Sequence, residues 1–249
     1  NLGLFSFPYF LRKVEWDLII YDWSFLGLRF ERERFIKVVK EISFLKSSGH
    51  AKKIAFPQDE FTSMDLLCEF INEFQVNIVY SVAPRNQWSK VYKTVSFDKV
   101  VFHQVLTGYL DDELTKNSKE ITEVGQVRDI DIGYRTVSSS VWGKFNLLKS
   151  DIAQLFLENC AHLKLDIKIG DEFFFQGEEW FEFLSRCRYT LGVEGGSTLL
   201  DWDGSHMNSV LNGEASWTEG GKYINSANNL SGVDINGLNK EEGIAKTIK

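Results

Sequence analysis

The chain has 249 residues, 43% of them hydrophobic and 25% charged, so it can bury a core in one large domain or two small ones. Its formal net charge of −7 argues against general binding to nucleic acids or anionic membranes, which need a net basic surface. No apolar run approaches the roughly 20 residues of a membrane-spanning helix, and no signal peptide is evident, so we expect a cytoplasmic protein.

The first half of the chain alternates short apolar runs with helical stripes. Asp17–Tyr21 has the length and composition of a buried parallel strand, and apolar residues from Phe35 to Leu45 recur at helical spacing. Further strands are predicted at Lys53–Phe56 and Val76–Tyr80, with a helix that begins near Thr62 between them. This alternation predicts a parallel sheet with crossover helices.

A polar stretch from Asp111 to Gly125 follows, and we place the domain boundary there. The same alternation then restarts. The expected elements are a strand at Asp131–Tyr134, a helix at about Phe145–Cys160, a strand at Leu163–Ile169, a helix at Glu178–Arg186 and a strand at Tyr189–Val193.

The predicted fold class is therefore α/β, with two Rossmann-like lobes built on parallel sheets. The first lobe is expected to cover residues 1–115 and the second residues 125–204. Residues 205–249 are rich in Asn, Gly and Ser and lack apolar periodicity. We expect them to form a polar tail that contributes little to the core, and we leave open whether it belongs to the native fold.

The three cysteines predict neither a disulfide framework nor a metal site. Cys68, Cys160 and Cys187 are far apart, lack CxxC spacing and are flanked by apolar residues. An odd number without a pairing pattern is typical of reduced thiols in a cytoplasmic protein. We therefore expect three free, mostly buried cysteines.

One basic cluster stands out in the first half. Arg29, Arg32 and Arg34 are interleaved with Glu31 and Glu33. Alternating charges of this kind are typical of a solvated helix face, so we expect these arginines to be exposed.

The acidic pair Asp59 and Glu60 follows a predicted strand, at the edge where open parallel sheets place their ligands. The two carboxylates could orient an acceptor hydroxyl or act as a base, or they could merely cap the next helix. His103 precedes Gly108 and could transfer a proton or contact a phosphate, although a structural histidine is the more common case. Asp59, Glu60 and His103 are the candidate catalytic residues.

Two arginines flank a predicted strand in the second half. Arg135 emerges at its carboxyl end, where a guanidinium can bind a diphosphate through two hydrogen bonds. Lys149 on the next helix could add a second positive charge, or it is an exposed helix lysine. Arg128, Arg135 and Lys149 could also bind the carboxylate of an acidic sugar.

The segment after the last predicted strand is the sharpest signal. Gly195 and Gly196 precede Ser197, which can cap a following helix, and N–H groups at a helix start attract phosphate. Glu194 is placed to accept hydrogen bonds from ribose or sugar hydroxyls, and Asp201 is a second acid nearby. The spacing matches neither the GxGxxG nor the Walker pattern. A plain strand–turn–helix junction would need the glycines but not both acids.

Five blocks in chain order resemble bacterial GT-B-like glycosyltransferases associated with surface polysaccharide synthesis. They span roughly residues 15–204 and are Gln58–Glu60, Leu106–Tyr109, Arg128–Arg135, Trp180 with Phe183–Leu184, and Leu191–Gly204. The resemblance implies an acceptor-side N-terminal lobe and a donor-side C-terminal lobe. It further implies that Glu194–Asp201 is the donor-binding junction. Residues 205–249 do not match that family's continuation, so either the donor lobe is incomplete and joined to unrelated sequence, or the chain is a diverged member.

The expected activity is sugar transfer from a nucleotide-sugar, which is a substrate and not a cofactor, to a glycan or lipid-linked acceptor. A lipid-linked acceptor would bring peripheral membrane association, and no nucleic-acid partner is expected. The protein would position the acceptor and stabilise the diphosphate leaving group electrostatically. The alternatives are a non-catalytic GT-B-like module that binds a glycan or another subunit, and a nucleotide-sugar epimerase. The donor, including a CMP-linked acidic sugar, and the stereochemical outcome stay open.

Overall fold

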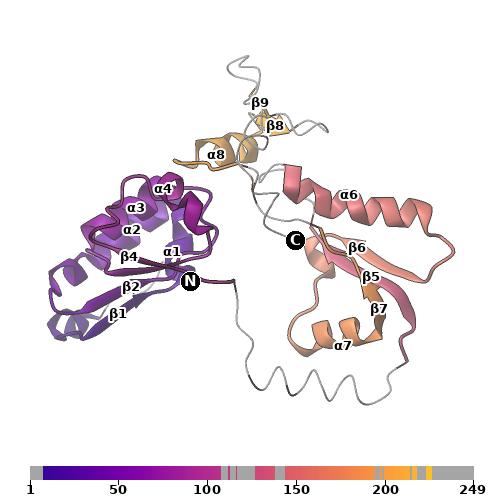
Figure 1. Cartoon of the computed structure of the whole chain (residues 1–249), viewed down its shortest axis with the longest axis horizontal. Coiled ribbons are helices and arrows are strands. Elements are labelled where there is room, and N and C mark those ends of the chain that lie inside the picture. The colour runs from indigo at the N-terminus through magenta and orange to yellow at the C-terminus, as the bar shows by residue number, and fades with distance from the viewer. Residues whose placement is uncertain are drawn as a thin grey trace. The chain divides into compact units, whose positions relative to one another are not determined.

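The computed structural model of the chain describes residues 8–107, 112, 116, 127–137, 144–193, 197, 199–213, 215–217 and 223–225. The chain divides into two units, residues 1–108 with 200–206, and residues 109–199 with 207–249. Each unit has its own parallel sheet and its own helices (Figure 1). The predicted α/β class with parallel sheets is therefore confirmed. Most of the polar stretch at residues 111–125 lies outside the described residues.

The first unit is built on a four-stranded parallel sheet in the order β1-β2-β3-β4. Its strands are β1 (Leu18–Tyr21), β2 (Lys52–Ala55), β3 (Ile78–Ser81) and β4 (Val101–Gln104). Its helices are η1 (Tyr9–Lys13), α1 (Trp23–Leu26), η2 (Gly27–Phe30), α2 (Arg32–Glu41), η3 (Ser43–Ser47), α3 (Met64–Glu73), η4 (Arg85–Gln87) and α4 (Trp88–Val91). The sequence predicts the first three strands but not β4.

The strand order equals the chain order, so every crossover moves in the same direction across the sheet. Because crossovers between parallel strands are right-handed, a constant direction puts all crossover helices on one face. Helices α2, α3 and α4 do lie on the same side of this sheet (Figure 1). The opposite face receives no crossover helix in the described part of the unit.

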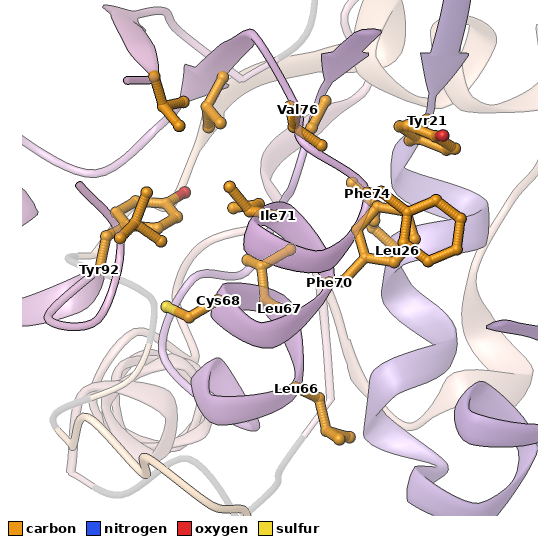
Figure 2. Packing of buried hydrophobic residues seen from close by; sticks show 14 of the residues in the cluster. Tyr21, Leu26, Leu66, Leu67, Cys68, Phe70, Ile71, Phe74, Val76 and Tyr92 are labelled. Carbon is orange, nitrogen blue, oxygen red and sulfur yellow. The ribbon is translucent and has the colours of Figure 1, made fainter. Parts of the chain in front are cut away.

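The core of the first unit lies between the sheet and these helices (Figure 2). Leu67, Phe70, Ile71 and Phe74 recur at the i, i+3, i+4, i+7 positions of one helix face and are all buried. The Phe70 ring stacks on Phe74 at 4.4 Å and meets Tyr21 of β1 edge-on at 4.8 Å. Each such side chain contributes about 1.5–3 kcal/mol through burial, so this stripe fixes α3 on the sheet.

The second unit contains a three-stranded parallel sheet in the order β6-β5-β7. Its elements are β5 (Ile130–Thr136), α6 (Lys144–Asn159), β6 (Leu165–Ile169), η5 (Asp171–Phe173), α7 (Glu178–Arg186) and β7 (Cys187–Thr190), close to the predicted positions. Ala153 of α6 packs with Ile132 and Ile167, whereas Phe183 of α7 packs with Cys187 in a separate cluster. The two helices thus cover opposite faces of the sheet.

Gly133 at the centre of β5 permits the close approach of α7. A Cβ at this position would lie 2.2 Å from the Cys187 sulfur and 2.8 Å from the Phe183 ring. Both distances are far inside van der Waals contact, so no side chain fits there without displacing α7 or β7.

The end of the described chain contains α8 (Ser205–Leu211) and an antiparallel pair, β8 (Ala215–Trp217) with β9 (Tyr223–Asn225). Asp203 caps α8 by accepting a hydrogen bond from the Ser205 N–H at 3.1 Å, and Met207 is buried. The start of the expected polar tail is therefore helical. The Asp203 hydrogen bond satisfies the first N–H group of this helix, and Met207 supplies its buried contact.

The three cysteines are free, as predicted. Cys68 and Cys187 are buried, but Cys160 is only partly buried. Within the residues that the structure describes, no helix combines the length and apolar character needed to span a bilayer.

Candidate functional site

In the second sheet, the direction in which the chain crosses from strand to strand reverses at the central strand, β5. The chain passes from β5 to β6 through α6 on one face, and then crosses back to β7, on the other side of β5, through α7 on the opposite face. Where neighbouring strands send their loops to opposite faces, a crevice opens at the carboxyl ends of the strands. In the 2-1-3 strand order found here, that position lies at the carboxyl ends of β5 and β7.

The expected donor-binding segment follows β7 directly. Leu191–Val193 lead from the strand into Glu194, Gly195 and Gly196, which lie outside the described residues. The Ser197 hydroxyl accepts a hydrogen bond from the Leu199 N–H at 3.1 Å, which is a local turn.

The prediction that a helix begins at Ser197 is wrong. Leu199 and Leu200 are not helical, and the first helix of the described chain after β7 is α8, which begins at Ser205. A serine hydroxyl can accept a hydrogen bond from the N–H group two residues ahead in a turn that no helix follows. The Gly-Gly-Ser pattern is therefore compatible with such a turn as well as with a helix start.

Arg135 lies at the carboxyl end of β5, as expected, but its guanidinium turns into the protein. It forms an ion pair with the Asp166 carboxylate at 2.9 Å and donates to the Asp166 carbonyl at 2.7 Å. The guanidinium also lies 4.2 Å from the Phe183 ring centroid and 5.0 Å from that of Phe175. Because its charge is already paired and its side chain buried, Arg135 binds no diphosphate in this conformation.

Arg128 and Arg135 lie at opposite ends of β5. Seven residues at about 3.3 Å each put them about 23 Å apart, so the two cannot bind one diphosphate. Arg128 donates to the Cys187 carbonyl at 2.9 Å at the amino end of the sheet. The structure places Lys149 on α6, half-buried.

The amino end of the second sheet carries ion pairs of its own. The Arg186 guanidinium binds the Asp129 carboxylate at 2.7 Å and holds its pKa well below the usual range. Lys164 lies 3.5 Å from the same carboxylate. These groups neutralise one another at the edge of the sheet remote from the crevice.

In the first unit, Glu60 is buried and its carboxylate is already bonded. It accepts hydrogen bonds from the N–H groups of Val82 at 2.9 Å and Ala83 at 2.8 Å, and from the hydroxyl of Tyr92. Burial raises the pKa of Glu60, although these hydrogen bonds oppose the shift. Glu60 therefore fixes the loop after β3, and in this conformation it offers no free oxygen to an acceptor.

Arg29 is the residue whose role the sequence prediction missed. Its side chain is 0% exposed, and Nη2 donates to the carbonyls of Gln58 and Asp59, both at 2.7 Å. Burial lowers the pKa of Arg29 to about 10. The prediction that Arg29 lies on a solvated face is wrong, because the guanidinium satisfies loop carbonyls under the sheet edge. The available signal was its position between Leu28 and Phe30.

Arg32 and Arg34 do pair at the surface, Arg32 with Asp65 at 2.7 Å and Arg34 with Glu31 at 2.8 Å. For these two residues the alternating-charge pattern indicates the correct environment.

Asp59 is the exposed member of the acidic pair. It adopts a left-handed backbone with φ of 54°, which the hydrogen bond from Arg29 to its carbonyl helps to hold. His103 is also exposed, and its ring stacks on Tyr80 at 5.1 Å on the sheet face opposite the helices. The described contacts thus join His103 to Tyr80, and not to Asp59 or Glu60.

Asp201 belongs to the first unit and not to the donor-side lobe. Its backbone forms a parallel bridge with Thr62, and its carbonyl accepts from the Ser63 N–H at 3.0 Å. The Trp202 carbonyl accepts from the Asp65 N–H at 3.0 Å. The expectation that Asp201 joins Arg135 in one lobe is therefore corrected: residues 200–206 return to the first unit and pair beside the start of α3.

No family model, no curated protein and no solved structure matches the chain. The likeness to GT-B glycosyltransferases thus stays a prediction, and the functional argument rests on the residues and topology of this chain.

Proposed function

We propose that the protein is a nucleotide-sugar glycosyltransferase of surface polysaccharide synthesis, with the donor at the carboxyl ends of β5 and β7. The observation that carries this proposal is the reversal of strand order at β5. Ligands of α/β sheets bind where such a reversal occurs. The chain that leaves β7 at this place contains Glu194, Gly195, Gly196 and Ser197.

The proposed chemistry needs little covalent work from the protein. Backbone N–H groups at Gly195 and Gly196 would stabilise the charge of the leaving diphosphate, and Glu194 would bind sugar or ribose hydroxyls. Asp59 is the preferred base on the acceptor side, because it is exposed whereas the Glu60 carboxylate is engaged. Arg135 supports the sheet through its ion pair with Asp166, so the proposal gives it no contact with the phosphates.

A non-catalytic module for a glycan or another subunit is the second candidate. It is favoured by Glu60 and Arg135, two charged residues that the sequence predicted at the site. The Glu60 carboxylate is hydrogen-bonded and the Arg135 guanidinium is ion-paired, both inside the fold. The two candidates differ in whether the protein releases the sugar from a nucleotide-sugar.

The test is thermal shift and calorimetry with UDP, GDP and CMP, followed by hydrolysis assays with the corresponding sugars. We expect one nucleotide to bind and its sugar to be released slowly. Loss of a hydrogen bond to a charged group costs about 1.5–3 kcal/mol, so Glu194→Ala should weaken sugar-nucleotide binding roughly tenfold to more than a hundredfold. Arg128→Ala, at the other end of β5, is the matched control. Binding without hydrolysis would favour the module, and no binding of any nucleotide would overturn both the donor site and the activity.

A further inference from the structure

The face of the first sheet opposite α2 and α3 carries apolar residues in register. Ile20, Ile54, Ile78 and Val101 are paired across all four strands. An aromatic row lies beside this aliphatic one. In it the Tyr80 ring stacks between the rings of Phe56 and His103, whose centroids are 4.8 Å and 5.1 Å away. We call this surface the open face; its side chains are Leu18, Ile20, Lys52, Ile54, Phe56, Ile78, Tyr80, Val101 and His103.

The two faces of the sheet differ sharply in burial. Ile20 and Val101 on the open face are each 54% exposed, whereas Val79 on the helix-covered face is 0% exposed. Parallel sheets are normally covered on both faces, and a contiguous exposed apolar patch of this kind marks an interaction surface. The cause is the constant direction of the crossovers, which leaves one face without a helix of its own.

A second copy of the chain does not suit this surface. Four strands at about 4.8 Å and five residues at about 3.3 Å give a footprint of about 19 by 16 Å, roughly 300 Å². A stable protein dimer buries about 800 Å² on each partner. The open face also carries Lys52 and His103 but no carboxylate, so two copies face to face would bury an unpaired ammonium group.

Helices suit it better. A helix is about 10 Å wide, so one or two would cover the footprint, as α2 and α3 cover the other face. Lys52 and His103 lie two strands apart and four residues apart in register, a diagonal of about 16 Å. A rise of 1.5 Å per residue makes this about 11 residues, three full turns. The Lys52 ammonium group and the His103 imidazole, each of which can donate a hydrogen bond, would therefore meet the same side of one helix.

We propose that the open face is a docking surface for an amphipathic helix of a partner protein. The helix packs an aliphatic stripe on Ile20, Ile54, Ile78 and Val101. It also presents two carboxylates, about 11 residues apart, to Lys52 and His103. This inference does not depend on the glycosyltransferase proposal.

The probe is a synthetic helical peptide of about 18 residues with a leucine stripe and two glutamates about 11 residues apart. Its fluorescence anisotropy is measured with the full chain, beside a peptide in which both glutamates are lysines. We expect saturable binding of the glutamate peptide and at least about tenfold weaker binding of the lysine peptide. Lys52→Glu should reverse the order of the two affinities, so that the lysine peptide binds more tightly.

Ile20→Lys should weaken the glutamate peptide about tenfold, because Ile20 is exposed and its replacement leaves the core intact. Ile36→Lys is the matched control, since Ile36 lines an apolar groove elsewhere on the first unit, a hollow of about 360 Å³ between α2 and α3. Circular dichroism checks the fold of each variant. Any one of three results overturns the proposal. The first is no binding of the glutamate peptide up to about 1 mM, a concentration at which even weak complexes form. The others are equal binding of the two peptides, and loss of binding in Ile36→Lys alone. A dimer in sedimentation that Ile20→Lys dissociates would instead assign the face to a second copy.

Discussion

Tyr92→Phe isolates one hydrogen bond inside the first unit. The Tyr92 side chain is fully buried and its hydroxyl donates to the Glu60 carboxylate. Phenylalanine keeps the ring, including its edge-to-face contact with Phe102 at 4.8 Å, and removes only the donor. A hydrogen bond to a charged group is worth about 1.5–3 kcal/mol, so we expect the first unit to lose about 2 kcal/mol near neutral pH. That corresponds to a fall in Tm of about 10 °C for a unit of this size.

The loss of stability caused by Tyr92→Phe should depend on pH. Burial raises the pKa of Glu60 in the folded state, so the stability linked to its protonated form is present at low pH and is lost as pH rises through that pKa. The hydrogen bond from Tyr92 partly offsets the loss, because it favours the ionised form. The deficit of Tyr92→Phe should therefore be largest near pH 7 and shrink toward about pH 4, where the carboxyl is protonated.

The assay is hydrogen exchange of the α3 and β3 amides across this pH range, which reports on the first unit alone. Tyr80→Phe is the matched control, because it removes a hydroxyl from the open face, and it should change stability by less than about 0.5 kcal/mol. Equal exchange protection in Tyr92→Phe and wild type at neutral pH would refute the assignment of Glu60 as a bonded structural carboxylate.

Three further outcomes are expected. Asp201→Ala should destabilise the first unit by about 1–2 kcal/mol through loss of its buried side-chain bonds; unchanged exchange in α3 would contradict the pairing with Thr62. Gly133→Ala should cost about 1–3 kcal/mol in chemical unfolding of the second unit, because the new methyl group meets Cys187; a neutral effect would mean that α7 is loosely packed. Native thiol titration should modify Cys160 first, because burial raises the pKa of Cys68 to about 11; faster labelling of Cys68 would contradict its buried position.

Local pattern was sufficient for most of the elements. The period of apolar residues predicts α6 and α7 nearly to their ends, and short apolar runs predict β1, β2 and β3. It fails for β4, an edge strand in which polar His103 and Gln104 follow two apolar residues. None of the four residues of β4 is fully buried, whereas buried and exposed residues alternate in β1, the other edge strand, so β4 lacks the apolar pattern that marks a strand.

The candidate site was harder to predict because its contacts are long-range. Arg29 bonds carbonyls 29 and 30 residues away, and Asp201 bonds Thr62 across 139 residues. No charge pattern within a short window contains these partners. The same limit applies to Arg135, since its strand position is readable from sequence whereas its turn toward Asp166 depends on the packing of α7.

The return of residues 200–206 to the first unit has a consequence for biosynthesis. Asp201, the backbone partner of Thr62, is encoded 139 residues downstream, beyond the whole second sheet. At about 5–20 residues per second, a ribosome delivers Asp201 roughly 7 to 28 seconds after Thr62. During this interval the nascent first unit presents the start of α3 without its backbone partners, so α3 completes its hydrogen bonding only after the second sheet has been synthesised.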